Sequence, residues 1–78
     1  MSMNNREFAW NDYNLDKIAK HGVSREEAEH VVRFFRSRRH KEGTRIVLGR
    51  GNSNRKLQVV FTLTADGEIY VIHAMPVR

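Results

Sequence analysis

Hydrophobic residues recur at helical spacing in the first part of the chain. Three of them lie three and four positions apart, which places them on one face of a helix: Leu15, Ile18 and Ala19. Either Asn11 or Asp12 can cap this helix by accepting hydrogen bonds from the free N–H groups of its first turn. Because Gly22 is suited to a helix end, the pattern predicts a first helix of roughly ten residues.

A second helix is predicted where Ser24 stands three residues before Glu27, the spacing of a capping box. Four apolar residues follow at helical spacing: Ala28, Val31, Val32 and Phe35. Acidic residues fall in the first turn and arginines in the last, as the helix dipole favours. We therefore predict a helix from about Arg25 to Ser37.

The second half of the chain changes to the two-residue period of strands. A first strand is predicted at 45–49, with its turn at 51–54, and a second at 57–64, where apolar and polar residues alternate. Asp66-Gly67 predicts a tight hairpin turn. The last strand, 69–74, is apolar at nearly every position, which favours a central place in the sheet.

Two helices followed by an antiparallel meander predict an α+β fold, with two N-terminal helices packed on a three- to four-stranded antiparallel sheet. The 78 residues allow one domain spanning 1–78. Aromatic side chains at helical or capping positions are interpreted as core residues rather than as base-stacking platforms: Trp10, Phe34 and Phe35.

Composition excludes several classes of protein. The chain has no cysteine, which excludes disulfides, thiolate zinc sites and cysteine nucleophiles. No apolar run approaches about 18 residues, and the N-terminus lacks the apolar segment of a secretory signal. We expect a cytoplasmic domain without a membrane partner.

Charge is concentrated in the middle of the chain. The net charge is +5, yet residues 33–56 carry nine Lys and Arg and a single acid, Glu42. Such a segment favours a polyanion or an acidic protein as partner, and a solvated basic surface is the alternative. The four histidines lack metal-ligand spacing and no carboxylate pair stands out, so we expect no metal and no cofactor.

Two motifs, the opening Phe8-Ala9-Trp10-Asn11 and the run 20–28, KHGVSREEA, begin a series that spans nearly the whole chain. They resemble the F-x-W-D and K-H-G-V/I-S/T-F-E-E-A motifs of the BrnT family of type II toxins. Arg45 with Gly49, the apolar strand before Thr62, and the run 69–74, IYVIHA, continue the order. The resemblance implies a RelE-like fold, metal-independent endoribonuclease activity and a small BrnA-like antitoxin as partner.

If this resemblance holds, the ribose 2′-OH of the RNA attacks the neighbouring phosphorus. This reaction needs an acid–base group and cations around the phosphorus. His73 is the candidate acid or base, and Arg45 and Arg50 are the candidate phosphate cations. A hydrogen-bonded histidine at a sheet edge and surface arginines paired with Glu42 or Glu68 are the structural alternatives.

Further basic residues are candidate contacts to the RNA backbone: Lys20, Arg36, Arg38, Arg39, Lys41, Arg55 and Lys56. The cluster at 36–41 fits an acidic antitoxin equally well. Lys17, Lys20 and His21 share one helix face, and for His21 we favour a structural role at the helix end.

A non-catalytic module that binds RNA or the antitoxin is the main alternative function. The family's last strand usually ends in A-R-x-A, whereas this chain has Met75 at the arginine position. A housekeeping domain that binds ribosomal RNA is a third reading. The small core makes a homodimer or a toxin–antitoxin hetero-oligomer plausible.

Overall fold

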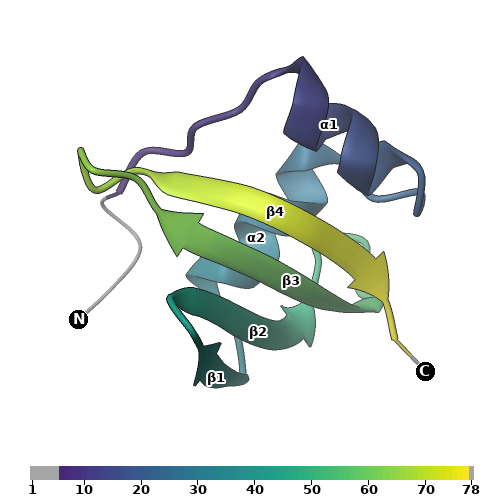
Figure 1. Cartoon of the computed structure of the whole chain (residues 1–78). Coiled ribbons are helices and arrows are strands. Elements are labelled where there is room, and N and C mark those ends of the chain that lie inside the picture. The colour runs from purple at the N-terminus through teal and green to yellow at the C-terminus, as the bar shows by residue number, and fades with distance from the viewer. Residues whose placement is uncertain (1–5, 78) are drawn as a thin grey trace.

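The computed structural model describes residues 6–77, which form two helices and a four-stranded antiparallel sheet (Figure 1). The elements follow in the order α1 (Asp12–Ala19), α2 (Arg25–Arg33), β1 (Ser37–Lys41), β2 (Thr44–Arg50), β3 (Lys56–Leu63) and β4 (Ile69–Pro76). The strands lie side by side in chain order, β1-β2-β3-β4. The predicted α+β class, with its two N-terminal helices, is confirmed.

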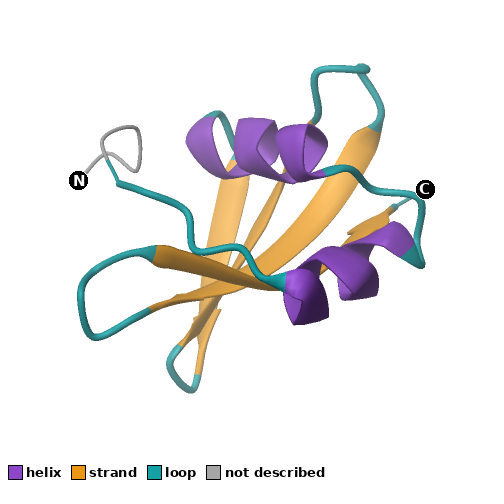
Figure 2. Cartoon of the chain, turned by 90° about the horizontal axis from the view of Figure 1, so that it is seen from above, coloured by secondary structure: helices purple, strands orange, loops and turns teal. Residues whose placement is uncertain are grey.

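One face of the sheet carries the core. Helix α2 lies behind β2 and β3, and α1 lies along β4 (Figures 1 and 2). The fully buried side chains alternate along the strands, as the two-residue period requires: Val47 on β2, Leu57, Val59 and Phe61 on β3, and Ile69 and Val71 on β4. The intervening side chains therefore point to the opposite face, which α2 does not cover; we call it the open face.

Both helices begin where the sequence indicates. The side chain of Asn11 accepts from the backbone N–H of Asn14, whose own side chain accepts in return from the N–H of Asn11. Ser24 and Glu27 form the predicted capping box at the start of α2. Gly22 has a φ of +71°, the left-handed conformation that separates the two helices without strain.

The predicted end of the second helix is wrong. Helix α2 ends at Arg33, and residues from Ser37 onward form the edge strand β1. The backbone N–H of Arg36 donates to the carbonyl of Leu48 at 2.8 Å, which aligns this segment with β2 instead of continuing the helix. Gly49 permits the approach, because a Cβ there would stand 3.1 Å from the Cα of Phe35.

This early exit also changes the prediction for the two neighbouring phenylalanines. Phe35 is partly buried and packs against the core, as expected. The prediction for Phe34 is wrong, since the side chain is 59% exposed and its ring lies 4.9 Å from that of His30. Trp10 is partly buried against the core, as expected, and its Nε1 donates to Glu29.

The predicted central position of the last strand is wrong as well, since β4 is an edge strand. Its apolar residues are covered by other means. Helix α1 packs against it, and the extended segment before α1 pairs with its start through a bridge between Phe8 and Ile69. The N–H of Ala9 donates to the carbonyl of Ile69, and the N–H of Ile69 donates to that of Glu7.

Asn14 fastens α1 to β4. The residue is completely buried, and its side-chain amide donates to the carbonyls of Ala9 and Val71 at 3.1 and 3.0 Å. A buried amide whose donors and acceptor are all used is tolerated in a core and fixes the geometry of its neighbours. The sequence pattern does not single out this asparagine.

Replacing Asn14 with alanine should therefore lower the free energy of unfolding by about 2–4 kcal/mol, because the buried carbonyl of Val71, the partly buried carbonyl of Ala9 and the helix cap lose their partner. Urea unfolding followed by circular dichroism measures the loss. Tyr13→Ala, one position away on the exposed side of α1, is the control and should cost well under half as much. Equal losses for the two variants would contradict the anchoring role.

Candidate functional site

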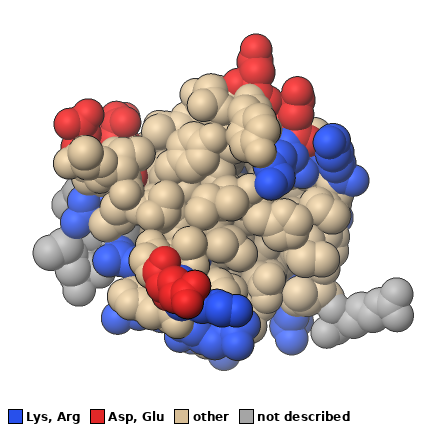
Figure 3. All heavy atoms as spheres, in the orientation of Figure 1, with Lys and Arg blue, Asp and Glu red and all other residues tan. Residues whose placement is uncertain are grey.

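The register of the sheet arranges the open face in rows that run across the strands. One row joins Arg39 on β1, Ile46 on β2, Val60 on β3 and His73 on β4. The next row joins Ser37, Leu48, Gln58 and Met75. The centre of this face is uncharged, and Lys and Arg gather along its lower margin, over β1 and β2 (Figure 3).

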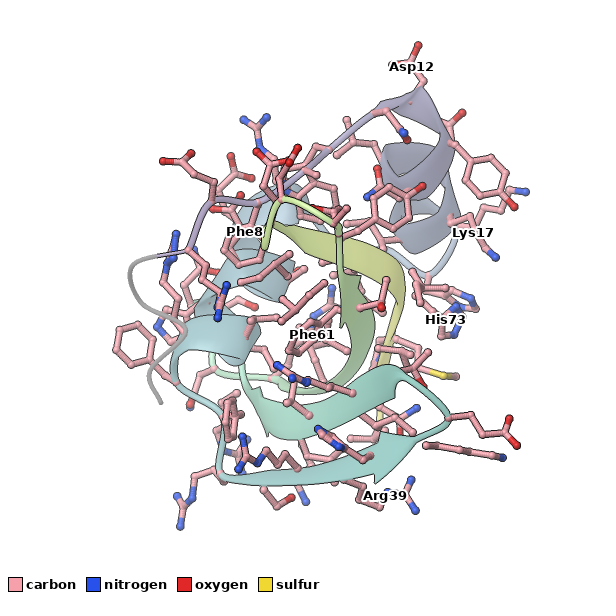
Figure 4. All side chains as sticks on the ribbon, turned by 60° about the vertical axis from the view of Figure 1, so that its left-hand side comes forward. Phe8, Asp12, Lys17, Arg39, Phe61 and His73 are labelled. Carbon is pink, nitrogen blue, oxygen red and sulfur yellow. The ribbon has the colours of Figure 1, made fainter. Side chains whose placement is uncertain are left out.

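His73 lies at the β4 end of its row, half-buried against the end of α1. Its ring meets that of His21 edge to face, with 4.8 Å between the centroids. Its Nε2 is 3.4 Å from the sulfur of Met75. Lys17 extends from α1 on the same side of the sheet, and Arg39 stands at the opposite end of the row (Figure 4).

The surroundings of His73 lower the pKa of its imidazole below the usual 6.5. Burial contributes most, because it disfavours the charged form, and the neighbouring His21 and Lys17 lower the pKa further by repulsion. His73 is consequently neutral at pH 7, the form in which an imidazole nitrogen can accept a proton.

His21 reaches this position because α1 ends beside β4. Its backbone N–H donates to the carbonyl of Ile18 at the end of α1, a bond that any non-proline residue at this position could make. Its ring, however, is exposed and contacts His73. The shared helix face of Lys17 and His21 is visible in the sequence, but the strand that this face would meet is not.

The two candidate phosphate arginines lie on different faces. Arg45 is in register with Phe61 and has the parity of buried Val47, so it belongs to the helix-covered face and the structure does not bring it to His73. Arg50 lies on the open face, paired with Lys56 at the far end of the strands. No described acid forms an ion pair with either arginine, Glu42 and Glu68 included.

The other basic candidates divide into three groups. Lys20 is exposed at the end of α1, next to His21 in the chain. An exposed group follows the edge strand: Arg38, Arg39 and Lys41. Arg36 and Lys56 lie near Arg50, where all three line a cavity.

Arg55, by contrast, is bound by other residues of the fold. Its guanidinium forms an ion pair with Glu27 at 2.8 Å, and it also donates to the carbonyl of Gly22. Glu27 is only 8% exposed and accepts a further bond from Ser53, and Arg55 is the main cause that lowers the pKa of its carboxyl to about 2. Arg55 therefore ties the start of α2 to the β2–β3 turn and has little capacity left for RNA.

Within residues 6–77, no cluster of three or more His, Asp or Glu side chains could hold a metal ion. No helix of this part of the chain is long and apolar enough to cross a membrane.

Comparisons with known proteins identify no relative of this chain. No family model, no curated protein and no solved structure matches the chain.

Proposed function

We propose that this chain is the toxin of a type II toxin–antitoxin system, a metal-independent endoribonuclease similar to the BrnT family that acts in the cytoplasm. The observation that carries the proposal is the contact between His73 and His21 on the open face of the sheet. Two imidazoles, one of them held neutral, supply the acid–base chemistry of RNA cleavage without a metal.

In the proposed reaction, His73 takes the proton from the ribose 2′-OH. The 2′-oxygen then attacks phosphorus, and the bond from phosphorus to the 5′-oxygen breaks. A protonated imidazole at His21 returns a proton to that leaving oxygen. Lys17 is close enough to this pair for its charge to act on His73, and it is suited to stabilise the phosphorane. The products are a 2′,3′-cyclic phosphate and a 5′-OH.

The charge distribution supports RNA as the substrate. An acidic side chain lies beside the basic margin of the open face (Figure 3), but the ion pairs of the described residues lie elsewhere, Arg25 with Glu26 and Arg55 with Glu27. Basic side chains attract a phosphate backbone without reading its sequence. The same margin and the uncharged centre beside it fit a small antitoxin with an acidic surface, which would block the site by covering it.

The test combines growth and chemistry. Induction of the intact chain in bacteria should arrest growth, and the purified protein should cleave single-stranded RNA in the presence of EDTA to products with 2′,3′-cyclic phosphate ends. The matched comparison is a His73→Ala/Arg45→Ala double variant, with each single variant beside it. Because Arg45 lies on the other face, relief of arrest should come from the His73 substitution alone. A soluble wild-type chain that neither arrests growth nor cleaves RNA would contradict the proposal.

A non-catalytic binding module is favoured by one observation, the position of Met75. Its sulfur stands 3.4 Å from Nε2 of His73, on the open face where the family's arginine would meet a phosphate. For such a module, RNA affinity should fall steeply with salt and no product should form. Met75→Arg separates the two functions, because gain of cleavage in this variant alone would favour the module.

A further inference from the structure

A second feature of the open face lies away from the histidines. A cavity of about 310 Å³ opens where the start of β1 meets the end of β2 and the start of β3. Six residues line it: Arg36, Ser37, Leu48, Gly49, Arg50 and Lys56. Three of the six are cations and none is an acid.

The backbone brings these three cations together. Arg50 and Lys56 are directly paired across β2 and β3. Arg36 joins them because the segment after α2 lies on β2, held by the hydrogen bond from its N–H to Leu48 and admitted by the missing side chain of Gly49. The early end of α2 thus creates the cavity.

No described acidic side chain forms an ion pair with the three cations of the cavity. The ion pairs of the described residues involve other side chains, Arg25 with Glu26 and Arg55 with Glu27. The guanidinium of Arg50 makes one hydrogen bond to the described residues, from Nη1 to the carbonyl of Asn54, which leaves further donors for a ligand. Three like charges around one cavity repel one another unless an anion lies between them.

We propose that this cavity binds a phosphate group of single-stranded RNA. The inference rests on the proposed function for its substrate, although the anion site itself does not require catalysis. Arg36 and Arg50 supply planar donors for the phosphate oxygens, Lys56 supplies a point charge, and Leu48 offers an apolar floor. The volume exceeds that of a phosphate alone and leaves room for part of the attached nucleotide.

The distance between the cavity and His73 indicates how the cavity would take part in RNA binding. Lys56 lies four residues before Val60 on β3, and Val60 is paired with His73. Four residues of strand span about 14 Å, so the cavity and His73 are separated by more than one nucleotide along the open face. Phosphate binding there holds the RNA across the sheet while the bond at His73 is cleaved.

The test uses ¹⁵N-labelled protein and two probes, inorganic phosphate and a short single-stranded RNA. Phosphate should shift the backbone amide signals of Ser37, Gly49 and Arg50. In a His73→Ala background, Arg50→Gln/Lys56→Gln should abolish these shifts, weaken RNA binding about tenfold or more and reduce its salt dependence by about one neutralised phosphate. Lys56→Gln alone should give a smaller loss in the same direction.

The matched control is Arg38→Gln/Lys41→Gln, which removes the same charge from β1 outside the cavity. Phosphate shifts at the cavity should persist in this control. Absence of these shifts in the parent protein would overturn the inference, and so would their persistence in Arg50→Gln/Lys56→Gln. Failure of the proposed function has a different signature: the cavity would still bind phosphate and RNA, while protein with His73 intact would not cleave.

Discussion

Replacement of His73 by alanine is expected to slow RNA cleavage by roughly 10²–10⁴-fold, the usual contribution of a positioned acid–base group. The expected loss of folding free energy is below about 1 kcal/mol, because the ring is only half-buried and makes no hydrogen bond to the backbone of the described residues. Single-turnover cleavage of a labelled RNA and urea unfolding give the two values. His40→Ala, at an exposed position of β1, is the control and should retain the cleavage rate. Full activity of the His73 variant would show that His73 is not the catalytic base.

The pH dependence of cleavage gives an independent readout of the same residue. His73 must be neutral to accept a proton, and its pKa lies below 6.5 because of burial and the charges of His21 and Lys17. The acidic limb of the rate profile should therefore have its midpoint below pH 6.5. In Lys17→Met one source of repulsion is gone, so the midpoint should rise toward 6.5. An unchanged midpoint in this variant would exclude His73 as the titrating base.

Replacing Glu27 with glutamine is expected to cause the largest loss of stability among exchanges that preserve side-chain shape. Its carboxylate is nearly buried, pairs with Arg55 and accepts from Ser53. The folded-state pKa of about 2, against an ordinary value of 4.5, corresponds to a stabilisation on the order of 3 kcal/mol at neutral pH. Urea unfolding at pH 7 should show a loss of this order in Glu27→Gln.

The pH at which this stabilisation disappears follows from the direction of the shift. A lowered pKa means that the folded state holds the proton more weakly than the unfolded state. The contribution is complete above about pH 5 and is lost as the pH falls through 4.5 toward 2. Glu26→Gln is the matched control, since Glu26 is exposed and its contact with Arg25 spans 3.6 Å. A Glu27 variant that keeps the wild-type pH dependence between 5 and 2 would contradict this account.

Local rules predicted the local parts of the fold. Capping boxes, helical spacing and the Asp66-Gly67 turn depend on residues within a few positions of one another, so α1, the start of α2 and the hairpin of β3 and β4 could be located from the sequence. The α+β class follows from their order.

The errors arise where distant segments meet. A strand that is apolar at nearly every position is expected to be buried on both faces. The sequence does not say whether neighbouring strands or a helix bury it. In β4 the second cover is α1, fastened by Asn14, so the strand lies at an edge. The end of α2 depends in the same way on Gly49, which accepts the following segment onto β2.

The candidate site likewise has features that the sequence predicts and features that only the tertiary structure determines. The types of residue to which we assign the proposed chemistry, a histidine on the last strand and a basic central segment, could be identified from the sequence alone. Strand register and helix docking decided which of these residues share a face. His21 contacts His73, Arg45 lies on the other face, and Arg55 forms an ion pair with Glu27. The physical reason is that side-chain period and caps act over a few residues. The contacts named here join residues 28 to 52 positions apart, and only the packed core brings such residues together.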